Sequence, residues 1–72
     1  MSKTFGTYLR DFRREQGYTQ EEAAHRAACS PKAWSHWECD RQLPSLPNLE
    51  RIRFALGLST RQVDLLVQSA RR

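Results

Sequence analysis

Long apolar runs are missing from this sequence of 72 residues, whose mean hydropathy is −0.76. No stretch approaches the roughly 20 apolar residues that span a membrane, and the first residues lack the apolar segment of a signal peptide. We therefore expect a cytoplasmic protein without membrane contact. The length fits one compact domain, residues 1–72, and leaves no room for a second.

Cysteine and histidine are also scarce. Cys29 and Cys39 lie ten positions apart without a CxxC pattern, and His25 and His36 share no carboxylate at the spacing of metal ligands. We expect reduced cysteines and neither a metal nor another cofactor. No nucleophile, base and orienting group occur together, because the neighbours Ser35 and His36 would point about 100° apart on a helix. We therefore predict no catalytic residue and no enzyme.

Proline and glycine are few, and runs of β-branched residues are missing. Proline first occurs at Pro31, and the glycines are Gly6, Gly17 and Gly57. So few helix breakers, together with the absence of a strand pattern, indicate an all-α chain of about five short helices.

Several helix ends are marked in the first half of the chain. Gly17 stands where a first helix would end, and Thr19 precedes Glu22 by the spacing of a capping box, which predicts a second helix. Ser30 and Pro31 suit the N-cap and first position of a third helix. Because only about three residues separate the second helix from this cap, the two must cross sharply, as in a helix-turn-helix.

The second half predicts two further helices. Residues 39–44 form a polar connector, and Ser45 can cap a fourth helix that ends near Gly57. Ser59 and Gln62 have the spacing of another capping box, at the start of a last helix.

Positive charge predominates slightly. The formal net charge is +4 and the pI is about 9.7, and only Lys3 and Lys32 among the basic residues are lysines. Arginine suits phosphates and guanine edges. Many small domains are mildly basic without binding nucleic acid, so the charge alone leaves both interpretations open.

The order and spacing of these features resemble the lambda-repressor/Cro family of helix-turn-helix domains, within a core motif that we place in residues 3–58. The resemblance implies a fold in which helices two and three form the helix-turn-helix, and a bacterial or phage-encoded protein that binds double-stranded DNA. The matching residues are Leu9, Phe12, Arg13 and Gly17, then Thr19 to Glu22 with Ala24, then Ser30 to Glu38, Pro44 and Ser45, and Leu56 to Leu58.

Several positions depart from the family's pattern. Ala23 and Ala27 stand where the family usually has leucine. Ala28 and Cys29 replace its glycine and valine, and Trp34 replaces an isoleucine or valine. We interpret these changes as coupled, because a large indole can fill the volume that two alanines vacate.

The expected core includes Phe12, Ala24, Trp34 and Trp37. The two tryptophans are three positions apart, so they share one face of the third helix. This spacing favours a buried stripe, although it would also suit a platform on which bases stack.

The opposite face of the third helix carries Lys32, Ser35 and His36, with Ala33 at its edge. The resemblance implies that this face enters the major groove. There Lys32 would donate to guanine, and His36 would donate or accept according to its tautomer. Ser35 is adaptable, and Ala33 would touch a thymine methyl group. The alternative for each residue is an ordinary solvated surface.

We expect contacts to DNA phosphates from residues that precede the third helix in the sequence and from residues that follow it. Gln20 begins the second helix, where backbone N–H groups and the helix dipole attract phosphate, and the resemblance gives this glutamine the same role. Arg41 and Gln42, which follow the third helix, would fix register rather than read sequence. Thr19 and Pro31 complete the expected set.

The resemblance also implies an ion pair between Arg13, on the first helix, and Glu38, at the end of the third. A buried pair would orient the recognition helix while adding little net stability. The alternative is two exposed charges that never meet.

One recognition helix buries too little surface to select a site well, so we expect a homodimer on palindromic half-sites about one helical turn apart. The expected interface lies on the C-terminal helix, residues 59–70, through Leu65, Leu66 and Val67. It also includes Phe54, a position that is usually polar in the family. The same side chains would alternatively cap the core of a monomer.

Together these features predict a sequence-specific regulator of transcription that acts as a repressor or an autoregulator. The alternative is a protein-interaction module, such as an antitoxin or adaptor, whose basic face is incidental. Salt separates the two, because DNA binding weakens steeply as salt rises and an apolar interface barely responds.

Overall fold

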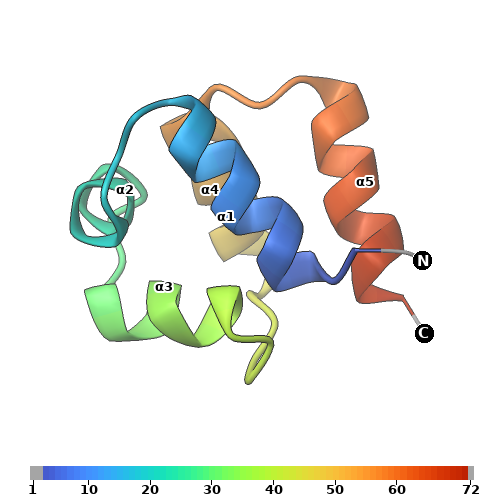
Figure 1. Cartoon of the computed structure of the whole chain (residues 1–72), viewed down its shortest axis with the longest axis horizontal. Coiled ribbons are helices and arrows are strands. Elements are labelled where there is room, and N and C mark those ends of the chain that lie inside the picture. The colour runs from blue at the N-terminus through green and yellow to red at the C-terminus, as the bar shows by residue number, and fades with distance from the viewer. Residues whose placement is uncertain (1–2, 72) are drawn as a thin grey trace.

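The computed structural model describes residues 3–71, which form five helices and no strand (Figure 1). The helices are α1 (Phe5–Glu15), α2 (Gln20–Arg26), α3 (Pro31–Glu38), α4 (Leu46–Leu56) and α5 (Thr60–Ala70). The predicted all-α fold is confirmed. None of these helices is long and apolar enough to cross a membrane.

Serine or threonine caps the start of each helix. In every case the hydroxyl oxygen accepts a hydrogen bond from the backbone N–H three residues further on, which satisfies one of the free donors of the first turn. Both predicted capping boxes are formed, at the starts of α2 and α5. The N-caps are Thr4, Thr19, Ser30, Ser45 and Ser59.

The turn between α2 and α3 contains backbone strain. Ala28 has a φ of 55°, in the left-handed region that glycine occupies most easily. A Cβ atom makes this conformation unfavourable by about 1–2 kcal/mol. The alanine that replaces the family's usual glycine is therefore held in place by the helices on either side.

Gly6 allows α1 to approach the end of α3 closely. A Cβ atom at this position would overlap the backbone carbonyl of Glu38 and lie 2.9 Å from the carbonyl oxygen of Trp37. The N–H of Gly6 donates to Oδ1 of Asp40 at 2.8 Å. This contact fixes the start of the connector that follows α3, and sequence reasoning did not predict it.

The core contains the large indole that the sequence places on α3. Trp34 is fully buried, and Ala23 and Ala27 are 0% and 2% exposed in the same cluster. This arrangement agrees with the interpretation that the indole replaces volume lost at the two alanines. All four side chains predicted for the core are buried, namely Phe12, Ala24, Trp34 and Trp37.

The last helix contributes to this core as well. Leu66 is 0% exposed, whereas Leu65 and Val67 are half-buried. The expectation that Leu66 forms part of a dimer interface is wrong, because its side chain lies inside the single chain. Phe54 on α4 is 87% exposed and remains available at the surface.

The packing leaves one side of α3 uncovered. α3 packs against α1 and α2, α5 packs against α1, and α4 packs against α2. In Figure 1, α3 runs along the lower edge of the molecule with α1 above it and no other element below.

Candidate nucleic-acid interface

The inward face of α3 is held by its two tryptophans. Trp34 is 0% exposed and Trp37 is 3% exposed, and their ring centroids lie 5.8 Å apart in a tilted arrangement. Rings buried to this extent cannot stack on bases, so the alternative interpretation of the tryptophans is excluded. They anchor the helix from within.

The outward face of α3 has few internal partners. Lys32 is exposed, and its ammonium makes no hydrogen bond or ion pair within residues 3–71. Ser35, His36 and Ala33 are half-buried on the same helix. The residues predicted to contact bases thus lie together on α3, away from its two buried tryptophans.

The end of α3 is attached to α1 by a buried ion pair. Nε of Arg13 lies 2.6 Å from Oε2 of Glu38, and Nη2 donates to Oε1 at 3.1 Å. The two side chains are 10% and 2% exposed. The remaining Nη1 of Arg13 donates to the carbonyl oxygen of Tyr18 at 2.8 Å. The alternative of two exposed charges that do not meet is therefore excluded.

Two further donors complete the surroundings of Glu38. The indole Nε1 of Trp34 donates to Oε2 at 2.6 Å, and Nε2 of Gln20 donates to Oε1 at 2.9 Å. The carboxylate therefore links α1, α2 and α3. Sequence reasoning missed both contacts, although the i, i+4 spacing of Trp34 and Glu38 is a signal that could have indicated the first.

These contacts determine the charge of Glu38. Burial alone would raise the pKa of its carboxyl group, but hydrogen bonds from Arg13, Gln20 and Trp34 and the charge of Arg13 outweigh this effect and hold the pKa below its usual value. Glu38 is consequently ionised at neutral pH, as its four hydrogen bonds require.

The residues predicted to contact phosphate lie near the surface. Gln20 is half-buried, and Thr19, Pro31, Arg41 and Gln42 are exposed. The hydrogen bond to Glu38 brings Gln20 to the C-terminal end of α3, the same end from which Arg41 and Gln42 continue. The other N–H of the Gln20 amide group has no partner within the part of the chain that the structure describes.

Comparison with known proteins gives two matches. Residues 4–66 match the model of a family described as a helix-turn-helix domain. The crystal structure of the clp gene regulator ClgR from C. glutamicum is similar, with 34% sequence identity and a TM-score of 0.75 over 90% of this chain and 82% of that chain. No match occurs among curated protein sequences. The sequence match and the five-helix architecture agree, and this chain belongs to the helix-turn-helix domain family of DNA-binding regulators.

Proposed function

We propose that this protein is a repressor or autoregulator of transcription that binds a palindromic operator as a homodimer. The observation that carries the proposal is the contrast across α3, whose inner side is fixed by buried tryptophans while Lys32 on its outer side has no partner among residues 3–71. A rigid helix with free donors on one side is what reading of the major groove requires.

Base recognition is assigned to the outward face of α3. Lys32 donates to O6 or N7 of guanine, and His36 donates or accepts on a neighbouring base. Ser35 adds an adaptable hydroxyl group and Ala33 a methyl contact with thymine. The half-buried state of these last three residues leaves Lys32 as the most prominent donor.

Phosphate contacts fix how α3 lies on the duplex. Gln20 uses its second amide N–H and the first turn of α2, while Arg41 contributes a guanidinium group from the connector. Thr19, Pro31 and Gln42 complete this set. Because Gln20 also bonds Glu38, the phosphate contact and the orientation of α3 are coupled through one side chain.

Two copies are needed because one helix buries too little surface for selectivity. A two-fold pair of domains presents two α3 helices to half-sites about one helical turn apart. An operator occupied in this way excludes other proteins from the same DNA, which supports repression. The similarity to ClgR, described as a gene regulator, supports a role in transcription.

Salt dependence tests this function directly. An operator selected from a random duplex library should bind with an affinity that falls at least about 100-fold between 50 and 200 mM salt, because phosphate contacts release counterions. Fluorescence anisotropy of a labelled duplex measures the change. A protein-interaction module would instead select no consensus sequence and show no steep salt slope, and that result would refute the proposed function.

A further inference from the structure

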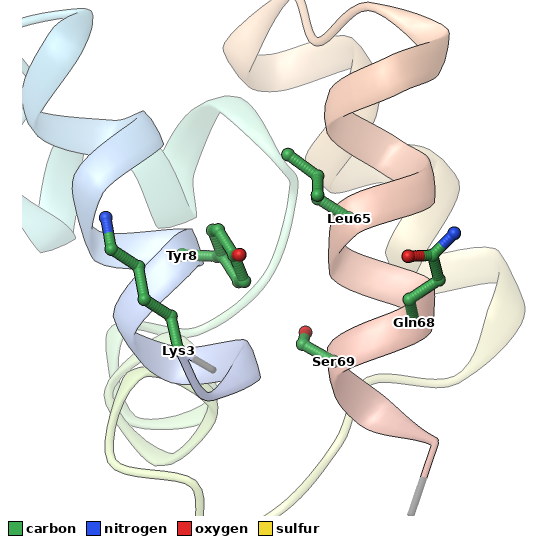
Figure 2. Close-up of a pocket in the computed structure, with 5 residues that line it drawn as sticks. All are labelled: Lys3, Tyr8, Leu65, Gln68 and Ser69. Atoms are coloured by element: carbon green, nitrogen blue, oxygen red, sulfur yellow. The ribbon is translucent and has the colours of Figure 1, made fainter. Parts of the chain in front are cut away.

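Among the hollows on the surface of residues 3–71, two differ in character. One lies between α1 and α5, has a volume of about 250 Å³, and is lined by Lys3, Tyr8, Leu65, Gln68 and Ser69. Figure 2 shows Tyr8 and Leu65 pointing into the space between the two helices. Its other groups are an ammonium, an amide and a hydroxyl, so polar and apolar surface are mixed there and water can be held.

The other hollow, which we call the α2–α4 hollow, is mainly apolar and has a volume of about 330 Å³. Alanines at the end of α2 and in the following turn face residues of α4 across it. It is lined by Arg26, Ala27, Ala28, Glu50, Arg51 and Phe54.

Phe54 is the most exposed large apolar side chain of residues 3–71, at 87%. An exposed phenyl ring beside an apolar hollow is unfavourable in water, and aromatic anchors that enter pockets dominate protein interfaces. The ring lines the hollow without being covered by it. The surface therefore presents both a projecting group and a recess large enough to receive one.

The charges at this hollow are of both signs. Glu50 and Arg51 are exposed, and neither forms an ion pair within the described part of the chain. The guanidinium group of Arg26 already lies 4.8 Å from the ring centroid of Tyr18, and its Nε donates to the carbonyl oxygen of Ala55 at 3.4 Å. Nη1 of Arg51 donates to Oδ1 of Asn48 at 3.4 Å, a neutral and exposed partner, so the charge of Arg51 remains available to an incoming carboxylate.

We propose that the α2–α4 hollow is the interface with a second copy of this chain. In a two-fold contact each surface meets itself, so Phe54 of one copy enters the hollow of the other. Glu50 of each copy then meets Arg51 of the other. This inference rests on the proposed function, which requires a homodimer, and identifies the surface that forms it.

The position of the hollow is compatible with DNA binding. None of its lining residues belongs to α3, so the outward face of that helix stays free when the copies associate. A stable interface buries about 800 Å² on each partner, about a sixth of the 4925 Å² surface of this chain. The contact must therefore extend along the exposed side of α4, and we expect a dimer that dissociates at micromolar concentrations.

The first test is the replacement of the anchor. Sedimentation equilibrium between 1 and 200 µM should show that Phe54→Glu raises the dimer dissociation constant at least about tenfold. Leu43→Glu is the control, because Leu43 is a 54% exposed leucine that lies outside α4 and does not line the hollow. It should associate as the wild type does, and thermal melts should show all three proteins folded. Equal association of the Phe54→Glu variant and the wild type would overturn the inference.

A charge exchange distinguishes a second copy from any other occupant. Glu50→Arg and Arg51→Glu should each weaken the dimer, and the double variant should regain an affinity within about threefold of the wild type, because both partners change together. A double variant weaker than either single variant would overturn the two-fold contact. A wild-type chain that stays monomeric at 200 µM, alone and on a palindromic duplex, would assign the hollow to a different protein.

The inference and the proposed function fail separately. Phe54→Glu should still bind a single half-site with the wild-type salt slope while losing cooperative binding to the palindrome. If the wild type forms the predicted dimer but binds no DNA, the proposed interface is supported and the proposed function is refuted. If the Phe54→Glu variant remains a dimer and binds the palindrome cooperatively, the proposed function is supported and the proposed interface is refuted.

Discussion

The two sides of α3 differ in how firmly the rest of the chain holds them. On the inner side, Trp34 and Trp37 are buried, and Glu38 accepts hydrogen bonds from three different residues. On the outer side, Lys32 has no partner within the part of the chain that the structure describes, and His36 is half-buried. This difference separates folding from recognition on a helix of eight residues. Substitutions on the inner side of α3 should affect stability, and substitutions on its outer side should affect DNA binding.

The largest loss of stability is expected for substitution of Glu38, the charged residue on the inner side of α3. Glu38→Ala should lower the free energy of unfolding by about 3–5 kcal/mol, because it leaves the buried Arg13 guanidinium without its partner. Urea denaturation followed by circular dichroism measures the change. Since a domain of this size has a small margin of stability, the variant should be largely unfolded at 37 °C.

A double variant controls for the charge itself. Arg13→Met combined with Glu38→Leu removes both ions and keeps apolar volume, so it should be more stable than Glu38→Ala alone. The single variants Arg13→Met and Glu38→Leu complete the comparison. If the double variant loses as much stability as these two together, the ion pair is not a coupled unit.

A smaller loss is expected when one donor to Glu38 is removed. Trp34→Phe keeps an aromatic ring in the core but removes the indole N–H that donates to the carboxylate, and should cost about 2–3 kcal/mol. Trp37→Phe is the matched control, because the Trp37 indole makes no hydrogen bond to another residue in the range 3–71. Thermal unfolding should show a lower melting temperature for Trp34→Phe than for Trp37→Phe. Equal losses of stability would mean that Trp34 contributes only through packing.

The smallest effect, and one of opposite sign, is expected in the turn that leads into α3. Ala28→Gly should stabilise the protein by about 0.5–1 kcal/mol, because glycine relieves the left-handed strain but loses more backbone freedom on folding. Ala27→Gly, at a φ of −86°, should destabilise it instead. The denaturant concentrations at the midpoints of unfolding compare the stabilities of the two variants with that of the wild type. A loss of stability in Ala28→Gly would show that the backbone at Ala28 is not strained.

Local patterns in the sequence predicted most of the fold. The N-caps Thr19, Ser30, Ser45 and Ser59 were recognised from the sequence, because a capping signal depends on only a few neighbouring residues. The cap of α1, Thr4, was not predicted. The contacts of Glu38 with Gln20 and of Gly6 with Asp40 were not predicted, because they join elements distant in sequence. Leu66 was misassigned because three apolar residues in a row on a helix do not indicate which one faces the core.

The candidate site was predictable to a similar extent. The pairing of Arg13 with Glu38 followed from the family resemblance, and the structure adds the donors that surround it. The base and phosphate contacts stay predictions, because they depend on a duplex. Likewise, only the folded chain brings Phe54 beside the end of α2, so the α2–α4 hollow could not be inferred from sequence.

The separation of the two sides of α3 is tested most directly by replacing Lys32 and His36 with alanine together. Anisotropy at one salt concentration should show that binding to the selected operator weakens at least about tenfold while binding to random DNA changes little. The melting temperature should stay close to that of the wild type, because neither side chain is buried in the core. Unchanged operator binding, or a loss of stability comparable to that of Glu38→Ala, would contradict the account.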